Sequence, residues 1–333
     1  MHVPRDKGSG PLMQDFWGDR YFSMPYREPA PVASPVMDAD AWYDETLESS
    51  LSEHLSTHAY DAVILIRFFL SKALVLFPKE TVKIIDTNDI FSNRHELFIK
   101  QGLAPKWFST TPDQEAKALD RADALMAMHA RDKEFFSGLF PEKPVFCVGH
   151  WTPIFQAQKR AKRNHLLFVG TLNHMNEHGL RFFIKEIFPL AKTLVPDLKL
   201  LVAGRVGEAV QGSPGVTCLG EVANLESVYA QADVAINPVL FGTGLSTKSI
   251  EAMGFGIPLI STRAGAEWLE ERKEPAFKIA DSPEEFSRAI ADLLKNSKEY
   301  EYFSRKGLEF AQAYNQQSEN AIRFLFNFSK VCQ

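Results

Sequence analysis

The chain has 333 residues, 45% of them hydrophobic and 24% charged, and a formal net charge of −5. This length leaves room for two domains of ordinary size, and the composition is typical of a soluble globular protein. The negative net charge argues against general nucleic-acid binding, and no apolar run approaches the ~20 residues that cross a bilayer.

The three cysteines, Cys147, Cys218 and Cys332, show no metal-binding spacing, and their odd number gives no disulfide framework. The first residues are polar and contain proline and glycine, so no signal peptide is visible. We therefore expect a reducing compartment and a cytoplasmic location.

Residues 1 to about 40 are rich in proline, glycine and aromatic side chains, and we predict that they are mostly irregular. A first series of short apolar runs then alternates with helical segments. Its predicted strands are 60–66, 81–86, 124–128 and 145–148. Within the first strand, residues 62–66 are continuously apolar, which is typical of a buried strand.

A second alternating series follows, with predicted strands at 165–169, 198–203, 216–220, 234–236 and 259–262. A helix is predicted at 283–295. Another covers most of 299–328, with a break near Tyr314 and Asn315. Its apolar positions Phe324, Leu325 and Phe328 suit docking onto another surface. The alternation predicts two doubly wound α/β units, each a parallel sheet covered on both faces.

We predict four regions along the chain: an N-terminal domain at 1–150, a linker at 151–163, a C-terminal domain at 164–305, and a C-terminal helix at 306–333 that packs back toward the N-terminal domain. The linker ends in a basic run, which is Lys159, Arg160, Lys162 and Arg163. We interpret this run as a solvated surface. The alternative is a peripheral contact with an anionic inner membrane face, worth about 1 kcal/mol per cation.

One stretch, from Asp233 to Pro258, has the order strand, glycine loop and helix. The loop amides of 242–245 and the positive end of the following helix are typical of an anion site. Lys248 and Glu251 are three residues apart, so they lie on roughly one face of the helix. A lysine there can neutralise a phosphate, and a carboxylate can bind the hydroxyls of a ribose. This order predicts a nucleoside diphosphate laid across the turn; the alternative is a plain turn with a surface Lys–Glu pair.

The sequence NPVLFGTGLSTKSIEAMGFGIPLIST, residues 237–262, resembles the donor-site signature of retaining glycosyltransferases of the GT-B type, family-4-like, also described as glycosyl transferases group 1. In that family the loop amides and the lysine hold the donor diphosphate, and the last glutamate of a Glu-x7-Glu motif holds the ribose. The resemblance therefore implies phosphate contacts from Gly242, Thr243, Gly244, Leu245 and Lys248, and a ribose contact from Glu251. The first glutamate of the motif is replaced by Thr243.

The resemblance extends to two other loops of the C-terminal domain. Gly170 and Thr171, followed by Asn176 in the sequence NEHGL, are similar to the first loop of the family's donor domain. The alternative for Asn176 is that it only caps a helix. Arg205 follows a strand-ending glycine. In the family the residue at this position commonly faces the diphosphate or the base; the alternative is a surface arginine.

In the N-terminal domain, Asp86-Thr87-Asn88-Asp89 resembles the family's D-T-H-D loop, which approaches the reacting sugar. We therefore take Asp86, Asn88 and Asp89 as candidate catalytic residues. Asn88 stands in place of the usual histidine and cannot relay a proton at neutral pH. The alternative for Asp86 and Asp89 is that they only cap the loop. We interpret His129 as a surface histidine at the end of a strand.

The resemblance implies the GT-B fold, two tandem Rossmann-like domains facing across a cleft. Family members usually begin with a strand, a glycine-rich loop and a long helix before the sequence that matches Trp17-Gly18-Asp19. This chain lacks them, so we expect either a naturally short member or an N-terminally truncated one. That loop normally borders the donor phosphate and the acceptor, so its absence, like Asn88, puts the activity of the expected glycosyltransferase in doubt.

The implied function is transfer of a sugar, with retention, from a UDP- or GDP-linked donor in the second domain to an acceptor on the first. No metal and no further cofactor are expected. The acceptor would be a glycan, a lipid-linked glycan or a protein, and the oligomeric state is not predicted. Two alternatives stay open: a nucleotide-sugar epimerase on the same fold, and a non-catalytic relative that binds without transferring.

Overall fold

The computed structural model describes residues 9–23, 34, 36–105, 108–155, 163–242, 246–267, 269 and 274–331. The chain divides into two compact units: unit 1 comprises Met1–Val148 and Ala321–Gln333, and unit 2 comprises Gly149–Asn320. Some residues singled out in the sequence lie outside the described ranges: Thr243, Gly244 and Leu245 of the glycine loop, and Lys159, Arg160 and Lys162 of the basic run.

Unit 1 contains a parallel sheet in the order β1-β2-β3-β4. Its strands are β1 (Ala62–Ile66), β2 (Val82–Asp86), β3 (Ala124–Ala127) and β4 (Val145–Cys147). The other elements described here are α1 (Ser9–Trp17), α2 (Glu45–Thr57), the 3₁₀ helix η2 (Phe68–Leu76), α3 (Arg94–Lys100), α4 (Pro112–Leu119) and α5 (Ala130–Leu139).

The two faces of the unit 1 sheet are covered differently. One face packs Ile85 and Leu125 against residues of η2, α4 and α5. The other face packs Val82 and Ile84 against Leu325, which comes from the last part of the chain. The alternation of apolar residues along a strand places these two sets on opposite faces.

Two predictions for unit 1 are wrong. The first strand is not buried, because β1 is the edge strand of its sheet, and Ile64 and Ile66 are 46% and 69% exposed. Residues 9–17 are not irregular but form α1, in which Pro11 lies in the first turn. A proline is tolerated there because the amide it lacks has no partner within the helix.

Unit 2 contains a six-stranded parallel sheet in the order β10-β9-β8-β5-β6-β7. Its strands are β5 (His165–Val169), β6 (Lys199–Ala203), β7 (Val216–Gly220), β8 (Val234–Asn237), β9 (Leu259–Ser261) and β10 (Lys278–Ile279). The two series of strands and helices give two parallel α/β sheets, as predicted.

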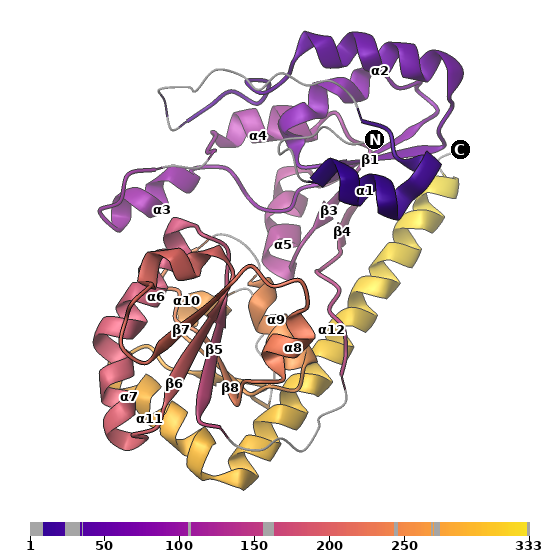
Figure 1. Ribbon diagram of the computed structural model, residues 1–333. Helices are drawn as coiled ribbons and strands as arrows, with labels where there is room; N and C mark the ends of the chain where they lie inside the picture. The colour runs from indigo at the N-terminus through magenta and orange to yellow at the C-terminus, as the bar shows by residue number, and fades with distance from the viewer. Residues whose placement is uncertain are drawn as a thin grey trace. The chain divides into compact units, whose positions relative to one another are not determined.

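Helices cover both faces of the unit 2 sheet. They are α6 (His174–Phe182), the π segment η3 (Phe183–Ile187), α7 (Phe188–Leu194), the 3₁₀ helix η4 (Arg205–Val210), α8 (Leu225–Tyr229), α9 (Thr247–Gly254), α10 (Arg263–Ala266), α11 (Pro283–Lys295) and α12 (Ser297–Val331). One core cluster joins the sheet to α6, α7 and α11, and a second joins the other face to α8, α9 and α12 (Figure 1).

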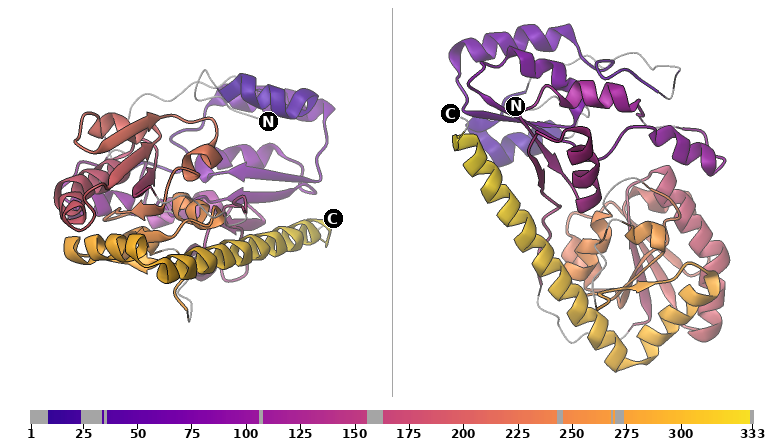
Figure 2. Two further views of the ribbon diagram at one scale, coloured as in Figure 1. Left: turned by 60° about the horizontal axis from the view of Figure 1, so that its bottom comes forward. Right: turned by 180° about the vertical axis from the view of Figure 1, so that it is seen from behind.

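The last helix, α12, runs without interruption over its 35 residues and is the long yellow helix of Figure 2. The predicted break near Tyr314 and Asn315 is therefore wrong. At its C-terminal end Leu325 is buried against the unit 1 sheet and Phe328 packs beside it, but Phe324 is 66% exposed and does not dock. Within the described residues, no helix combines the length and apolar character needed to span a membrane.

Candidate functional site

At the carboxyl edge of the unit 2 sheet, the backbones after β5 and β6 lie against each other. The Gly170 amide donates to the Ala203 carbonyl at 2.9 Å, and the Val206 amide donates to the Gly170 carbonyl at 3.4 Å. Gly204 has φ +93°, and a Cβ there would lie 2.2 Å from the Gly170 oxygen. Only glycine allows this approach at residue 204, so the two loops pack closely at the edge where parallel sheets bind ligands.

The first amides of α9 are not capped by the side chain of the residue that precedes the helix. Ser246 makes no cap hydrogen bond; its Oγ instead accepts from Nδ2 of the buried Asn237 at 2.9 Å. By contrast α6, α8, α10 and α11 all begin with a side-chain cap. A helix N-terminus whose amides lack such a cap is suited to binding an anion.

Lys248 lies in the first turn of α9, and its ammonium group is held by neutral partners. Its Nζ donates to Asn176 Oδ1 at 2.5 Å and lies 4.7 Å from the centroid of the Phe168 ring. Burial lowers the pKa of Lys248 to about 7, and the nearby Glu251 carboxylate acts in the opposite direction. The group is therefore a desolvated cation that gains strongly from a neighbouring negative charge.

Asn176 connects Lys248 to the loop after β5. Its Nδ2 donates to the Thr171 carbonyl at 2.9 Å while its Oδ1 accepts from Lys248. The alternative that Asn176 caps α6 is wrong, because the cap is Asn173, whose Oδ1 accepts from the Asn176 amide at 2.9 Å. The preference for asparagine at helix N-caps could have identified Asn173 from the sequence.

The glycine of the NEHGL sequence brings α6 against the segment that follows β8. A Cβ at Gly179 would lie 2.7 Å from the Pro238 carbonyl oxygen, so only glycine allows this contact. A Cβ at Gly242 would lie 3.6 Å from Met175 Sδ of the same helix. The glycine loop and the start of α6 are thus neighbours, which explains why Asn176 and Lys248 meet although they are 72 residues apart.

Arg205 and Glu251 have other partners in the structure. Arg205 Nε lies 3.4 Å from Glu208 Oε1, and both side chains are 60% exposed. Glu251 Oε1 lies 3.4 Å from Nε2 of His150, a residue that sequence reasoning did not select. Sequence reasoning also missed Phe168, because neither contact leaves a local signal in the sequence.

The unit 1 loop that follows β2 is stabilised by its own hydrogen bonds. Asn88 adopts a left-handed backbone with φ 61°, and its amide donates to Asp86 Oδ1 at 3.1 Å. Asp89 is 4% exposed and lies 3.0 Å from Arg94 Nη2. Burial raises the pKa of Asp86, and the Asn88 amide and Arg67 act in the opposite direction.

His129 is not a surface residue, so its interpretation from sequence is wrong. It is 4% exposed, and its Nδ1 accepts from the Asp132 amide at 3.2 Å, which caps α5. Its Nε2 lies 3.0 Å from Asp132 Oδ2. Burial lowers the pKa of His129 to about 4 and raises that of Asp132 to about 8, so the pair is neutral at pH 7.

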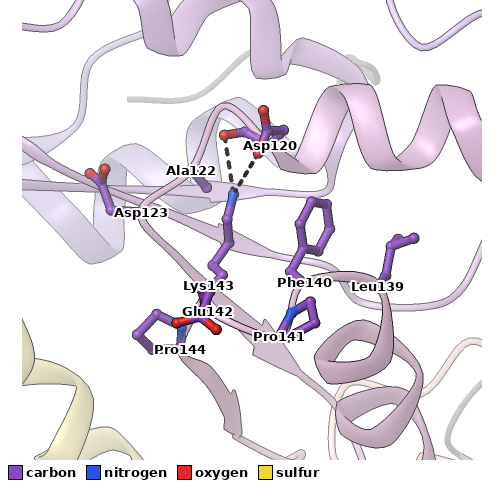
Figure 3. Close-up of a pocket in the computed structure, with 9 residues that line it drawn as sticks. All are labelled: Asp120, Ala122, Asp123, Leu139, Phe140, Pro141, Glu142, Lys143 and Pro144. Atoms are coloured by element: carbon purple, nitrogen blue, oxygen red, sulfur yellow. Dashed lines mark hydrogen bonds and ion pairs between the residues drawn. The ribbon is translucent and has the colours of Figure 1, made fainter.

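A shallow pocket of about 470 Å³ opens at the opposite, amino edge of the unit 1 sheet, between the loops that precede β3 and β4 (Figure 3). Lys143 occupies it, donating to the Leu119 and Asp120 carbonyls at 2.9 and 3.1 Å. These carbonyls end α4, so Lys143 acts as a helix C-cap. The pocket is a structural feature and lies away from the edge at which parallel sheets bind ligands.

Comparison with known proteins places the strongest similarity in unit 2. Residues 163–296 match the family model described as glycosyl transferases group 1. A protein from Klebsiella pneumoniae, described as an uncharacterized 44.6 kDa protein in the cps region, is 27% identical over 146 residues, which is 40% of this chain and 37% of that protein.

Solved structures of glycosyltransferases share the fold over most of the chain. A structure of TarM has a TM-score of 0.62 and 12% identity, covering 84% of this chain and 57% of TarM. A mutant of S. aureus TarM, crystallised with UDP among other ligands, has a TM-score of 0.59 and covers 81% of this chain. HepE from Anabaena, crystallised with UDP and glucose, has a TM-score of 0.61 and 13% identity, covering 95% of this chain and 88% of HepE. The chain thus spans little more than half of TarM. Its two parallel-sheet units have the Rossmann-like fold of GT-B glycosyltransferases, and residues 163–296 match the group 1 family.

Proposed function

We propose that unit 2 binds the diphosphate of a nucleotide sugar and that the protein is a glycosyltransferase. The observation that carries this proposal is Lys248: a desolvated ammonium group, held by Asn176 beside the Phe168 ring, in the first turn of a helix that has no side-chain N-cap. Such a group has no structural advantage without an anion, because its burial is unfavourable to the charged form. A diphosphate supplies the missing charge.

The other proposed contacts follow from the same edge of the sheet. Gly204 lets the loops after β5 and β6 pack together at this edge, and a phosphate or sugar would lie against their backbone. Glu251, one turn after Lys248, would accept hydrogen bonds from the ribose hydroxyls. Arg205, which is well exposed, would turn from Glu208 toward the diphosphate. Thr243, Gly244 and Leu245 complete the proposed loop by their resemblance to the family.

The reaction proposed is transfer with retention and without a metal. The bond between the sugar C1 and the diphosphate oxygen breaks, and a bond from C1 to an acceptor hydroxyl oxygen forms on the same face. The hydroxyl proton passes to the departing phosphate. Lys248 and the α9 amides would stabilise that leaving group as preorganised charge. The nucleotide would be UDP in the first instance, since TarM and HepE were crystallised with it.

Unit 1 would hold the acceptor, for which we propose a glycan. One observation favours a second candidate function, a relative that binds a nucleotide sugar without transferring it. The three candidate catalytic residues are engaged with one another or with Arg94, and Asn88 provides no base. If the second candidate is right, the nucleotide binds but the sugar stays on it.

Turnover of nucleotide sugars separates these candidates. The protein is incubated with UDP-, GDP- and ADP-linked hexoses and a mixture of short glycans, and free nucleoside diphosphate and new glycans are measured. We expect one donor to be consumed, and the Lys248→Ala variant to release none. A nucleotide sugar that binds without release of nucleoside diphosphate would support the second candidate, the non-transferring relative. No binding of any donor would contradict both.

A further inference from the structure

The segment Gly149–Phe155, which we call the strap, is fixed to α12 by four hydrogen bonds between three pairs of residues. The Gly149 amide donates to Ser318 Oγ and the His150 amide donates to Tyr314 Oη, both at 3.1 Å. The Thr152 amide donates to Asn315 Oδ1 at 3.1 Å, and Asn315 Nδ2 donates back to the Thr152 carbonyl at 2.7 Å. The backbone of the strap therefore has one well-defined position on the helix.

The other side of the strap rests on the end of α9. The Phe155 amide donates to the Gly254 carbonyl at 2.9 Å, and the Phe155 ring stacks on Phe255 with centroids 4.4 Å apart. A Cβ at Gly254 would lie 2.5 Å from the Pro153 oxygen. A Cβ at Gly149 would lie 1.9 Å from Tyr314 Oη. Two glycines thus allow a close fit that side chains would prevent.

This fit places one functional side chain over α9. His150 Nε2 lies 3.4 Å from Glu251 Oε1, and the two side chains are 37% and 17% exposed. Glu251 also acts electrostatically on Lys248, the residue one turn earlier. A glutamate next to a buried lysine on the same helix face has an obvious competing partner in that lysine. The structure instead pairs Glu251 with the strap and Lys248 with Asn176.

We propose that His150 is a positioning residue that keeps the carboxylate of Glu251 apart from Lys248 and oriented for a vicinal diol. This inference rests on the proposed nucleotide site. The His150 ring, 3.4 Å from one carboxylate oxygen, restrains the Glu251 side chain and leaves lone pairs for two ribose hydroxyls. Lys248 is then not engaged in an ion pair with Glu251, and its ammonium group stays available to the phosphates. The strap thereby divides the site into a cationic phosphate half and an anionic hydroxyl half.

The test measures the Kd of UDP, GDP and ADP for the parent, and then compares the tightest of them with its 2′,3′-dideoxy analogue. We expect His150→Ala to weaken the natural nucleotide about 5- to 10-fold and to leave the dideoxy analogue unchanged. His150→Gln, which retains a donor, should restore binding to within about twofold. In a protein that already carries Glu251→Gln, adding His150→Ala should not change the Kd of the nucleotide further.

Ile154→Ala, which alters a partly exposed strap residue without a polar role, is the matched control and should bind as the parent does. An equal loss for the nucleotide and its dideoxy analogue would show that His150 is merely structural and would overturn the inference, as would unchanged binding by His150→Ala. In either case the proposed function survives. Failure of the parent to bind any of the three nucleotides would refute the proposed function and this inference with it.

Discussion

The carboxyl edges of the two sheets are built from similar elements but treat their charges in opposite ways. In unit 2 the buried cation Lys248 contacts a neutral amide and an aromatic ring. In unit 1 the buried acids have donors within the fold: Asp89 contacts Arg94, and Glu115 accepts from the Phe91 and Ser92 amides at 3.0 and 2.8 Å. Asp132 lies 3.0 Å from His129, and burial keeps both groups neutral at pH 7.

This difference indicates which edge is prepared for a charged ligand. A buried ionisable group is stabilised by a partner or shifts its pKa toward the neutral form. Unit 1 provides donors for Asp89 and Glu115 and keeps Asp132 and His129 neutral, so these groups do not call for a charged ligand. Unit 2 keeps a lysine whose pKa is lowered to about 7, and a ligand phosphate would supply the missing partner. Perturbed groups of this kind are typical of functional sites.

The largest effect expected from this comparison is the loss of nucleotide binding on removing the cation. Lys248→Ala should weaken the binding of a nucleoside diphosphate roughly 50-fold, because a charge-assisted hydrogen bond contributes about 1.5–3 kcal/mol. Calorimetric titration measures the change. The matched control is Lys199→Ala, an exposed lysine at the amino end of β6 in the same sheet, which should bind as the parent does. Equal losses in both variants would point to a general charge effect and break the comparison.

The next effect concerns unit 1 and the pH dependence of its stability. The folded-state pKa of Asp132 is raised to about 8 from 3.8, so the stability that its protonation provides is lost as the pH rises from 3.8 to 8. The pKa of His129 is lowered to about 4 from 6.5, so its contribution changes only below pH 6.5. Between pH 6.5 and 8 Asp132→Asn should gain about 1.5–2 kcal/mol of unfolding free energy relative to the parent.

Urea denaturation at several pH values measures this difference, in which the contribution of Lys248 cancels because both proteins contain it. A constant difference between the two proteins from pH 6.5 to 8 would mean that Asp132 is already ionised in the fold. Unit 1 would then contain a buried charged group without a charged partner, as unit 2 does, and the contrast between the two edges would weaken.

The smallest effect is the pH dependence of nucleotide binding itself. The bound phosphates should keep Lys248 protonated, while in the free protein it loses its proton above pH 7. Affinity should therefore fall with rising pH, by about fivefold between pH 7 and 8. Lys248→Arg, whose charge persists, should show no such slope. If the affinity of the parent protein stays constant from pH 7 to 9, Lys248 does not bind the phosphates of the nucleotide.

Local patterns were sufficient to predict much of this fold. Apolar runs separated by helical segments identified the two parallel sheets, and the spacing of Lys248 and Glu251 placed both on one helix face. The alternation could not tell an edge strand from a central one, so β1 was expected to be buried although Ile64 is 46% exposed. Strand order depends on long-range pairing, which no single apolar run specifies.

The partners within the site were harder to predict than its location. Asn176 and Lys248 were both selected, but their contact spans 72 residues and depends on the packing that Gly179 allows. His129 was misjudged because its burial comes from tertiary packing, and its local partner Asp132 three residues later is also what a surface cap would show. His150 gave no signal, since only the strap and α12 together place it at Glu251.

The most direct test of the central claim is a calorimetric titration of the parent protein at pH 7 with UDP, GDP and ADP and with the three corresponding nucleosides. If the carboxyl edge of unit 2 is a diphosphate site, one nucleoside diphosphate binds with micromolar affinity and its nucleoside binds at least about 100-fold more weakly, because the phosphates carry the interaction with Lys248. Binding of no diphosphate, or equal binding of a diphosphate and its nucleoside, would contradict the assignment.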